Sequence, residues 1–381
     1  MQVYLDNAAT TALDPAVLEA MLPYMTDHYG NPSSTHAHGR QTRSAIEQAR
    51  KKVAELLNVI PSEIFFTSGG TEADNTAIRC SIDSHNLRRA ITSRLEHHAV
   101  LHTLQELEKQ KKIQLDFVEF DERGNIDLNH LEELLRQPER ALVSLMHGNN
   151  EIGNLTDIQR VGELCAEHDA IFHSDTVQTL AHYPIDLKEI PVHCIAGAAH
   201  KFHGPKGVGL LYVAKGHKIC PLLHGGGQER NMRGGTENLY GIVGFAKALE
   251  LSHTHMEEHT QHIKSLKQRM IEGLQEQIPG VQFNGMSSDL DNSLYTVLNV
   301  SLPPSEDNDM LLFNLDLNQI STSGGSACSS GAQQGSHVLR ALQCDPQRGA
   351  IRLSFSRHNT IEEVDYVVKT LKSLYPVAVA Q

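Results

Sequence analysis

The sequence has few cysteines, no C-x-x-C pair and no apolar run long enough to span a bilayer. The lack of paired cysteines argues against zinc ribbons and thioredoxin-like redox sites. The chain also begins without the basic segment and apolar run of a signal peptide. These absences predict a cytoplasmic protein that does not associate with membranes.

Basic residues are outnumbered, since 33 lysines and arginines stand against 46 aspartates and glutamates, a formal net charge of −13. Binding to nucleic acid needs basic surface that offsets the phosphate charge, so no direct nucleic-acid binding is expected. Hydrophobic residues make up 40% and charged residues 21% of the 381 residues, which is ordinary for a globular protein of about two domains.

Strand-like and helix-like segments alternate through the first half of the chain. This alternation predicts an α/β fold with a mostly parallel sheet covered by helices. The expected strands are 62–68, 88–95, 115–120, 141–147 and 170–175, and the expected helices are 71–82, 98–112 and 157–169.

A long amphipathic segment, 243–278, predicts a helix that connects two domains. After it, strands and helices follow with a different spacing, which predicts a smaller α+β domain. Those elements are the strands 294–303 and 348–356 and the helices 309–317 and 360–374. We expect a large domain at 14–255 and a small domain made of 1–13 and 256–381.

Polar side chains follow nearly every expected strand of the first half. Ligands of open α/β sheets bind beyond the carboxyl ends of the strands, so these side chains are candidates for one shared site. In chain order the candidates are Gly70, Thr71, His97, Asn150, Asp175, Gln178, His200 and Lys201.

Lys201 is the candidate nucleophile of this set. It follows a strand of small apolar residues, where desolvation favours a neutral amine that attacks carbonyl groups. Lys206 lies in the turn "GPKG" and is expected to be exposed. Asp175 ends an apolar strand, and a carboxylate there needs a cationic partner such as a protonated pyridine nitrogen. Taken singly, each residue is explained as well by a surface charge or a helix cap.

Two glycine-rich segments are candidates for contact with anions. "SGGTEADN" (68–75) places Thr71 at the start of a helix, where backbone N–H groups favour an anion. It matches neither a P-loop nor a dinucleotide-binding motif. "GGGQERNMRGGTEN" (225–238) is rich in glycine and arginine, which favours a rigid loop facing an anion over an ordinary exposed loop.

Cys328 differs from the other cysteines because it lies in a run of serine, glycine and alanine, 321–335. An exposed thiol on such a segment is a candidate nucleophile, and the alternative is a linker with an incidental cysteine. Four other cysteines lie in or beside apolar segments and are expected to be buried and inert: Cys80, Cys165, Cys194 and Cys220.

Two histidine pairs, His98 with His102 and His255 with His259, have the i, i+4 spacing that permits a shared metal ion. Since a third ligand is not evident for either pair, we expect no metal site.

Taken together, the motifs are similar to those of the cysteine desulfurases of the NifS/IscS group. The segments "YLDNAATT", "GNPSSTHAHGR", "FTSGGTEADN", "EHHAV", "HGNNEIG", "HSDTVQ", "HKFHGPKG", "HGGGQERNMRGGTEN", "SGGSACSSG" and "AIRLSFSR" occur in the order seen in that group. The resemblance runs from residue 4 to about residue 370. It implies a class V, fold-type I enzyme that uses pyridoxal 5′-phosphate.

The resemblance also implies a role for each matching residue. Lys201 matches the lysine that bonds to the cofactor, and Cys328 matches the cysteine that accepts sulfur. Around the cofactor ring, Asp175 matches the partner of the pyridine nitrogen, Gln178 the contact to the ring hydroxyl, and His97 the histidine that stacks on the ring and transfers protons. Around the phosphate, the matching residues are Thr71, His200 and a partner subunit's Thr236, with Gly70 beside them. Asn150 and Arg352 match groups that hold the substrate carboxylate.

One position departs from the family pattern. The family usually has a serine two residues before the histidine and lysine, and its hydroxyl binds the phosphate; here that residue is Ala198. The loss of such a hydrogen bond to a charged group costs on the order of 1–3 kcal/mol. Ala198 is therefore expected to contact the cofactor through its backbone or its position alone.

The resemblance implies a homodimer that converts L-cysteine to L-alanine and a persulfide on Cys328. The sulfur then passes to an acceptor or scaffold protein in iron–sulfur cluster assembly or tRNA thiolation. Two alternatives stay open from the sequence. One is another class V enzyme, such as a selenocysteine lyase or an aminotransferase, and the other is a non-catalytic scaffold with the same fold.

Overall fold

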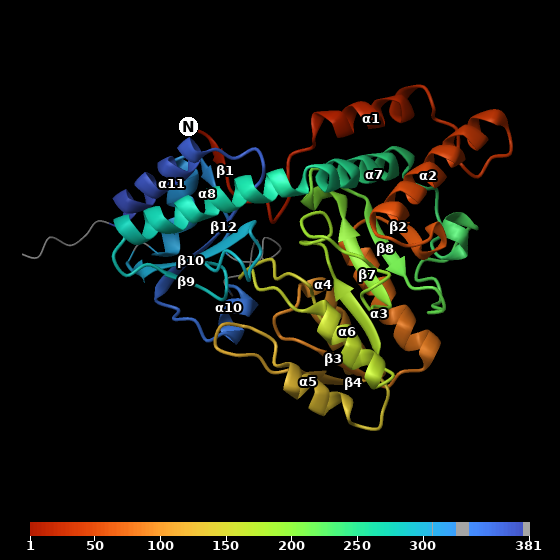
Figure 1. Ribbon diagram of the computed structural model, residues 1–381, viewed down its shortest axis with the longest axis horizontal. Coiled ribbons are helices and arrows are strands. Elements are labelled where there is room, and N and C mark those ends of the chain that lie inside the picture. Colours follow the sequence, from red (N-terminus) through yellow and green to blue (C-terminus); the bar gives the residue numbers. More distant parts are fainter. Residues whose placement is uncertain (307, 325–334, 376–381) are drawn as a thin grey trace, which may run out of the picture.

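The structure, a computed structural model, describes residues 1–306, 308–324 and 335–375. Figure 1 shows a larger part built around a wide sheet and a smaller part built around a sheet of fewer strands, joined by two consecutive helices. The expected α/β class is confirmed. Among the described helices, none is both long and apolar enough to cross a membrane.

The larger sheet has seven strands in the described part of the chain, in the order β2-β8-β7-β6-β5-β3-β4. Within it, β8 pairs antiparallel with both neighbours and the other pairings are parallel. The strands are β2 (Ile64–Thr67), β3 (Arg89–Thr92), β4 (Gln114–Phe117), β5 (Ala141–Ser144), β6 (Ile171–Asp175), β7 (Cys194–Ala198) and β8 (Gly209–Val213).

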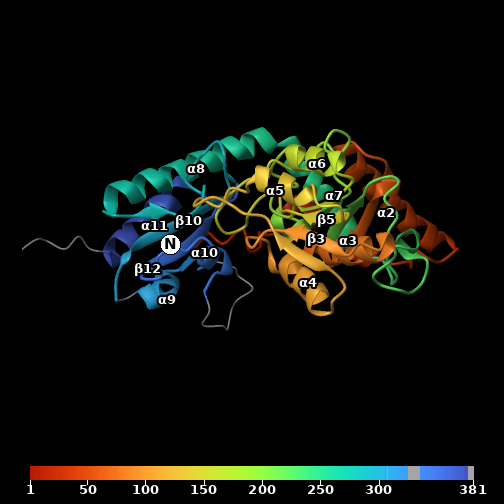
Figure 2. The same ribbon diagram turned by 90° about the horizontal axis from the view of Figure 1, so that it is seen from below.

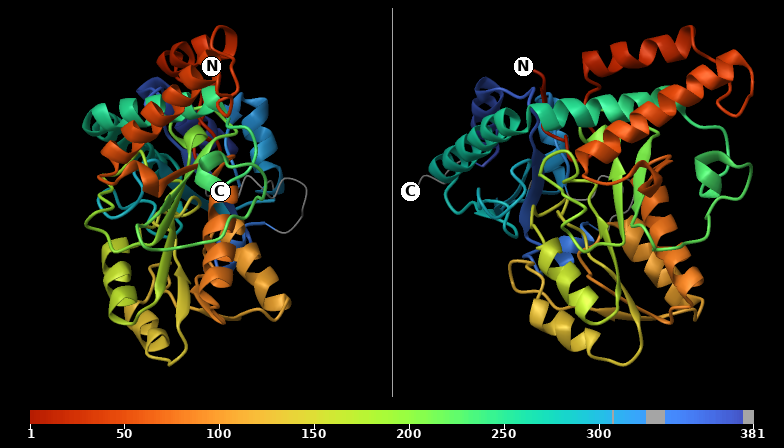
Figure 3. Two further views of the ribbon diagram at one scale, coloured as in Figure 1. Left: turned by 90° about the vertical axis from the view of Figure 1, so that its right-hand side faces the viewer. Right: turned by 45° about the vertical axis from the view of Figure 1, so that its right-hand side comes forward.

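Helices cover both faces of this sheet, and most of its strands are buried along their whole length. Figure 2 shows α3 (Gly70–His85) and α4 (His98–Lys109) on one side and α5 (Leu128–Leu135) and α6 (Ile158–Glu167) on the other. Figure 3 shows α1 (Pro15–Thr26) and α2 (Ala37–Leu56) beside α7 (Leu239–Thr254), against which both pack. The helices α1, α2 and α5 were not predicted from the sequence.

The smaller part is an antiparallel sheet of β9 (Gln282–Phe283), β10 (Val297–Pro304) and β12 (Arg348–Ser354). Two long helices, α8 (Met256–Gln277) and α11 (Ile361–Leu374), pack on it through a common apolar core. The short helices are α9 (Leu311–Leu317) and α10 (His337–Ala341), and the N-terminal β1 (Val3–Tyr4) pairs with β11 (Ile320–Ser321). The expected domain boundaries stay a prediction.

The prediction of a single connecting helix at 243–278 was wrong, because two helices meet at His255 (Figure 1). The backbone of His255 has φ −109° and ψ 16°, outside the helical range. The first helix, α7, is largely buried against α1 and α2, whereas α8 buries one face against the smaller sheet. Because the helix breaks at this point, α7 and α8 can each pack against a different core.

Candidate active site

One pocket brings together nearly all of the residues predicted at strand ends. It lies beyond the carboxyl ends of β5, β6 and β7, where parallel strands present their ligands. Its lining includes the predicted residues Gly70, Thr71, His97, Asn150, Asp175, Gln178, Ala198, His200, Lys201 and Arg352. Gly70 and Arg352, 282 positions apart in sequence, thus share one cavity.

The start of α3 forms the anion-facing wall of this pocket. Its N-cap residue is Gly69, and within the described residues no side chain caps the helix. The first backbone N–H groups are therefore available to an anion. Gly70 allows a close approach here, because a Cβ at this position would lie 2.7 Å from Cγ2 of Val177.

Asp175 ends β6 with its side chain in the pocket. Burial raises the pKa of this carboxyl to about 6, against the effects of the N–H of Val177 and of Lys201. That N–H donates to Oδ1 of Asp175 at 2.9 Å and fixes the side chain. A buried carboxylate in this position gains from a cationic ligand.

Lys201 follows β7 in a short 3₁₀ turn and reaches the same pocket. Its ammonium group donates to the carbonyl oxygens of Ala8 at 2.6 Å and Ala9 at 2.9 Å. These contacts hold the amine beside the N-terminal segment. Lys206 is exposed, as its turn sequence predicts.

Two neutral imidazoles flank the amine. His97 caps α4, and its Nδ1 accepts from the N–H of Ala99 at 3.2 Å, so the ring proton sits on Nε2. Burial, then Lys201, lowers the pKa of His97 to about 4. The same causes, in the same order, lower the pKa of His200 to about 4.

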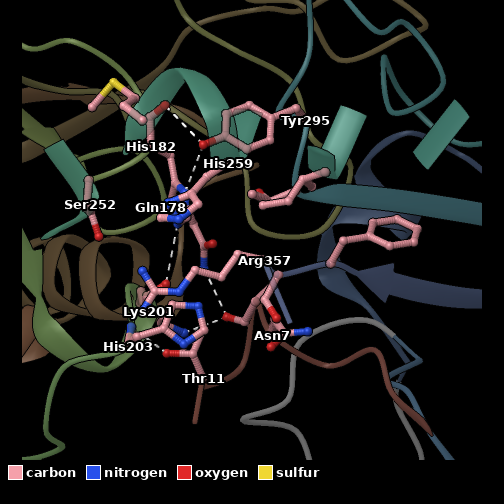
Figure 4. A pocket seen from close by; sticks show the side chains of 17 residues that line it. Asn7, Thr11, Gln178, His182, Lys201, His203, Ser252, His259, Tyr295 and Arg357 are labelled. Atoms are coloured by element: carbon pink, nitrogen blue, oxygen red, sulfur yellow. Dashed lines mark hydrogen bonds between the residues drawn. The ribbon is translucent and has the colours of Figure 1, made fainter. Parts of the chain in front are cut away.

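A second cavity lies behind Lys201 (Figure 4) and shares Ala8, Gln178 and Lys201 with the first. In it, Nε2 of His182 lies 3.4 Å from the carbonyl oxygen of Lys201, and Nδ1 lies 3.0 Å from the hydroxyl of Tyr295. The amide of Gln178 donates to the carbonyl of Ala8 at 3.0 Å. These contacts hold the backbone of Lys201 from behind.

Arg352 enters the pocket from β12 of the smaller part. Its Nη2 donates to Oδ1 of Asp6 at 2.8 Å and its Nη1 to the carbonyl of Asn150 at 3.0 Å. Its Nε is buried and has no acceptor among the described residues. A buried guanidinium N–H in this state suits a carboxylate ligand. Asp6, which orients Arg352, was missed because its partner is 346 residues away.

Ala198 is buried at the end of β7, next to the start of α3. A Cβ built on Gly70 would lie 3.8 Å from the Cβ of Ala198. The methyl group therefore occupies the place where the family pattern has a hydroxyl. The phosphate-side wall here consists of the helix start, Thr71 and His200.

Two predicted residues are not brought into this pocket by the described chain. Thr236 lines a separate cavity with Ser68, Gly207 and Arg233. Cys328 lies outside the described residues. On one side of it, the carbonyl of Ser323 accepts from the N–H of Arg352 at 2.6 Å, and on the other the hydroxyl of Ser336 donates to Glu151, the neighbour of the pocket residue Asn150.

The prediction that four other cysteines are buried was wrong for one of them. Cys80, Cys165 and Cys194 are buried as expected, but Cys220 is exposed, because it lies in the loop after β8 rather than in the sheet.

The rings of His98 and His102 stack at 4.4 Å between centroids, 10° from parallel. In the part of the chain that the structure describes, no group of three or more metal-ligating side chains occurs.

The lining suits pyridoxal 5′-phosphate, the cofactor that the sequence resemblance implies. The uncapped start of α3 suits a phosphate. The buried carboxylate of Asp175 suits a protonated ring nitrogen, and the amine of Lys201 lies in the same cavity. The unsatisfied Nε of Arg352 adds a place for the carboxylate of an amino acid.

Comparison with known proteins agrees with this site. The aminotransferase class-V family model matches residues 3–367. A cysteine desulfurase IscS of Clostridium botulinum is 43% identical over 378 residues, which is 98% of this chain and 94% of that protein. A solved NifS-like protein superposes with a TM-score of 0.90 at 38% identity over 98% of this chain and 99% of its own. The structure described as SspA in complex with cysteine gives a TM-score of 0.82 at 30% identity, over 94% and 100% of the two chains.

Proposed function

This chain belongs to the aminotransferase class-V family, and from that membership we infer that it is a cysteine desulfurase that depends on pyridoxal 5′-phosphate. L-cysteine is its substrate. The observation that carries the assignment at the level of the site is the convergence of Lys201, Asp175, His97 and Thr71 on one pocket.

We propose the following residues as the ones that hold the cofactor. Lys201 would bind it covalently through Nζ, Asp175 would pair with its ring nitrogen, and His97 would contact its ring. The start of α3 would hold its phosphate, with Thr71 and His200 as side-chain ligands. When bound, pyridoxal phosphate supplies an electron sink for the substrate Cα.

The side chains then divide the remaining work. Arg352 and Asn150 hold the substrate carboxylate, and Asp6 keeps Arg352 oriented. Nζ of Lys201 takes the Cα proton of the substrate. His97 carries its proton on Nε2 and supplies it to leaving groups.

Cys328 is the proposed sulfur acceptor. Its thiolate attacks the sulfur of L-cysteine, the carbon–sulfur bond of the substrate breaks, and a sulfur–sulfur bond forms. The thiol proton of Cys328 balances the hydrogen that the substrate carbon gains. The products are L-alanine and a persulfide on Cys328, whose outer sulfur passes to an acceptor or scaffold protein of iron–sulfur cluster assembly or tRNA thiolation.

Cys328→Ala is the variant that tests this assignment. We expect it to retain the visible absorbance of the cofactor and to form no enzyme persulfide, because the nucleophile alone is removed. The measurement is the alanine released from L-cysteine together with the protein mass. Cys220→Ala, which removes an exposed thiol far along the chain, is the control and should keep full activity. Full turnover by Cys328→Ala would favour another class V activity.

We also propose a homodimer located in the cytosol. Thr236 lies away from the pocket of its own chain, as a residue supplied to a partner's site would. An exposed apolar stripe on α1, with Leu18, Leu22 and Met25 between 41% and 49% exposed, is suited to burial between two chains. Sedimentation equilibrium should give twice the chain mass of 42.1 kDa, and a single-chain mass would contradict the dimer.

A further inference from the structure

A second buried carboxyl group lies in the cofactor pocket beside Asp175. It belongs to Asp74 in the first turns of α3, which is 1% exposed and lines the same cavity. None of the roles proposed above uses it. A buried carboxyl group is costly unless it is neutral or paired, so its state needs an explanation.

Asp74 faces one base. Its Oδ1 lies 3.4 Å from Nε2 of His173 on β6, and neither atom has a hydrogen-bond partner among the described residues. The other ring nitrogen, Nδ1, lies 2.9 Å from the hydroxyl of Ser144 on β5. Two unsatisfied buried atoms that face each other are satisfied together if one proton lies between them.

The surroundings decide which group carries that proton. Burial, then Asp175 and Glu96, raises the pKa of Asp74 well above its usual range. Burial lowers the pKa of His173 to about 3. Both shifts favour the neutral side chain. In that state the carboxylic acid can donate to Nε2, 3.4 Å away, and a ring proton on Nδ1 can donate to the hydroxyl of Ser144.

The other titratable groups that face this end of α3 do not favour a charged Asp74. Glu96 and His97 come from the residues just before α4 and Asp175 from β6, whereas Cys194 of β7 contacts Ser81, near the far end of the helix. Lys201 lies across the pocket, where its ammonium group is bound to Ala8 and Ala9. The two carboxyl groups of this set both oppose ionisation of Asp74.

We propose that Asp74 is a positioning residue that stays protonated and donates to His173, so that Asp175 is left as the carboxylate that pairs with the cofactor ring. A charged Asp74 would compete with Asp175 for the same cation and for the same proton. The inference rests on the proposed cofactor site, and it concerns the state of a residue that exists before the cofactor binds.

Cofactor-free protein provides the test, through urea denaturation between about pH 5 and pH 8. Asp74→Asn keeps the shape and the donor and cannot ionise. A carboxyl group with a raised pKa binds more protons in the folded state than in the unfolded one, so it makes stability fall as pH rises. The folding equilibrium constant of Asp74→Asn relative to the wild type should therefore rise by about tenfold per pH unit.

Asp83→Asn is the matched control, since Asp83 is exposed on the same helix and pairs with Lys112 at 3.5 Å on the surface. Its ratio to the wild type should change little over the range. A flat or falling ratio for Asp74→Asn would mean that Asp74 is ionised in the folded protein, and the proposal would be wrong.

Infrared spectroscopy of the wild type tests the proposal even if Asp74→Asn does not fold, because it detects protonated carboxyl groups directly. A protonated carboxyl band is expected at about pH 7 and should weaken in folded Asp74→Asn. Its absence from the wild type would overturn the proposal without any variant. Because these measurements need neither cofactor nor turnover, their failure is distinct from a failure of the desulfurase assignment, which alanine release from L-cysteine tests.

Discussion

Lys201→Ala is expected to lower the release of alanine from L-cysteine by about 10⁴-fold or more and to abolish the covalent bond to the cofactor. Two functions are lost at once, because the same amine holds the cofactor and moves the Cα proton. Proton transfer by a placed base alone contributes roughly 10²–10⁴-fold. The measurements are alanine release and borohydride reduction followed by mass analysis of the labelled peptide.

Lys206→Ala is the matched control, because it removes the nearby lysine of the "GPKG" turn. Lys206 is exposed and lies five residues after Lys201 in the sequence. It should leave the labelled peptide and the turnover nearly unchanged. Labelling at Lys206, or substantial turnover by Lys201→Ala, would show that the nucleophile had been assigned to the wrong residue.

The parts of the site that sequence predicts well are those set by a single strand end. Asp175 and Lys201 follow runs of small or apolar residues, and parallel strands bring their carboxyl ends to one edge. Local sequence therefore fixes both where these side chains emerge and toward which edge. The antiparallel β8 does not disturb this edge, since it lies beyond β7.

Pairings over long sequence separations escape this reasoning. Asp6 orients Arg352 from the other end of the chain, and nothing near either residue in sequence indicates the other. Asp74 is similar, because a polar residue in the first turns of a helix is usually solvated. Its burial depends on how α3 packs against β6 and α4. The break at His255 also depends on long-range packing, because α7 packs into the core of the larger part and α8 into the core of the smaller part.

A buried ion pair in the loop 225–238 was not predicted from the sequence. The glycine and arginine content predicted a rigid loop facing an anion, and the structure places Glu229, paired with Arg50, at its centre. Glu229 accepts from both terminal nitrogens of Arg50 at 2.7 and 2.9 Å and from the N–H of Phe66 at 2.9 Å. The two charged side chains are 3% and 2% exposed. The pair ties the loop to α2 and to the edge strand β2.

This anchor also holds an unfavourable backbone. Glu229, Arg230 and Asn231 have φ values of 44°, 55° and 67°, in the left-handed region. Each such residue costs roughly 1–2 kcal/mol when it is not glycine. Three in succession persist because the buried contacts of Glu229 determine the path of the chain. Arg233 adds a further link to α3 through Glu72 at 2.9 Å.

Glu229→Ala is therefore expected to reduce the free energy of unfolding by about 3–5 kcal/mol, the usual cost of leaving one partner of a buried ion pair behind. Arg50 would keep its contacts with the carbonyl of Ile64 and with Glu47 at 3.1 Å, but it would lose the buried carboxylate, and the N–H of Phe66 would lose its acceptor. Urea denaturation of the purified protein measures the change.

Arg230→Ala is the matched control for that loss. Arg230 has the same left-handed backbone, so alanine meets a similar backbone cost at both positions. Its ion pair with Glu47 is 3.0 Å long, but its side chains are 38% and 50% exposed, and exposed pairs contribute at most about 1 kcal/mol. Arg230→Ala also removes a hydrogen bond to the carbonyl of Pro61 at 2.6 Å, so the difference between the two variants is a lower bound on the effect of the buried pair. Equal losses would place the stability of the loop in its backbone turn rather than in the Arg50–Glu229 pair.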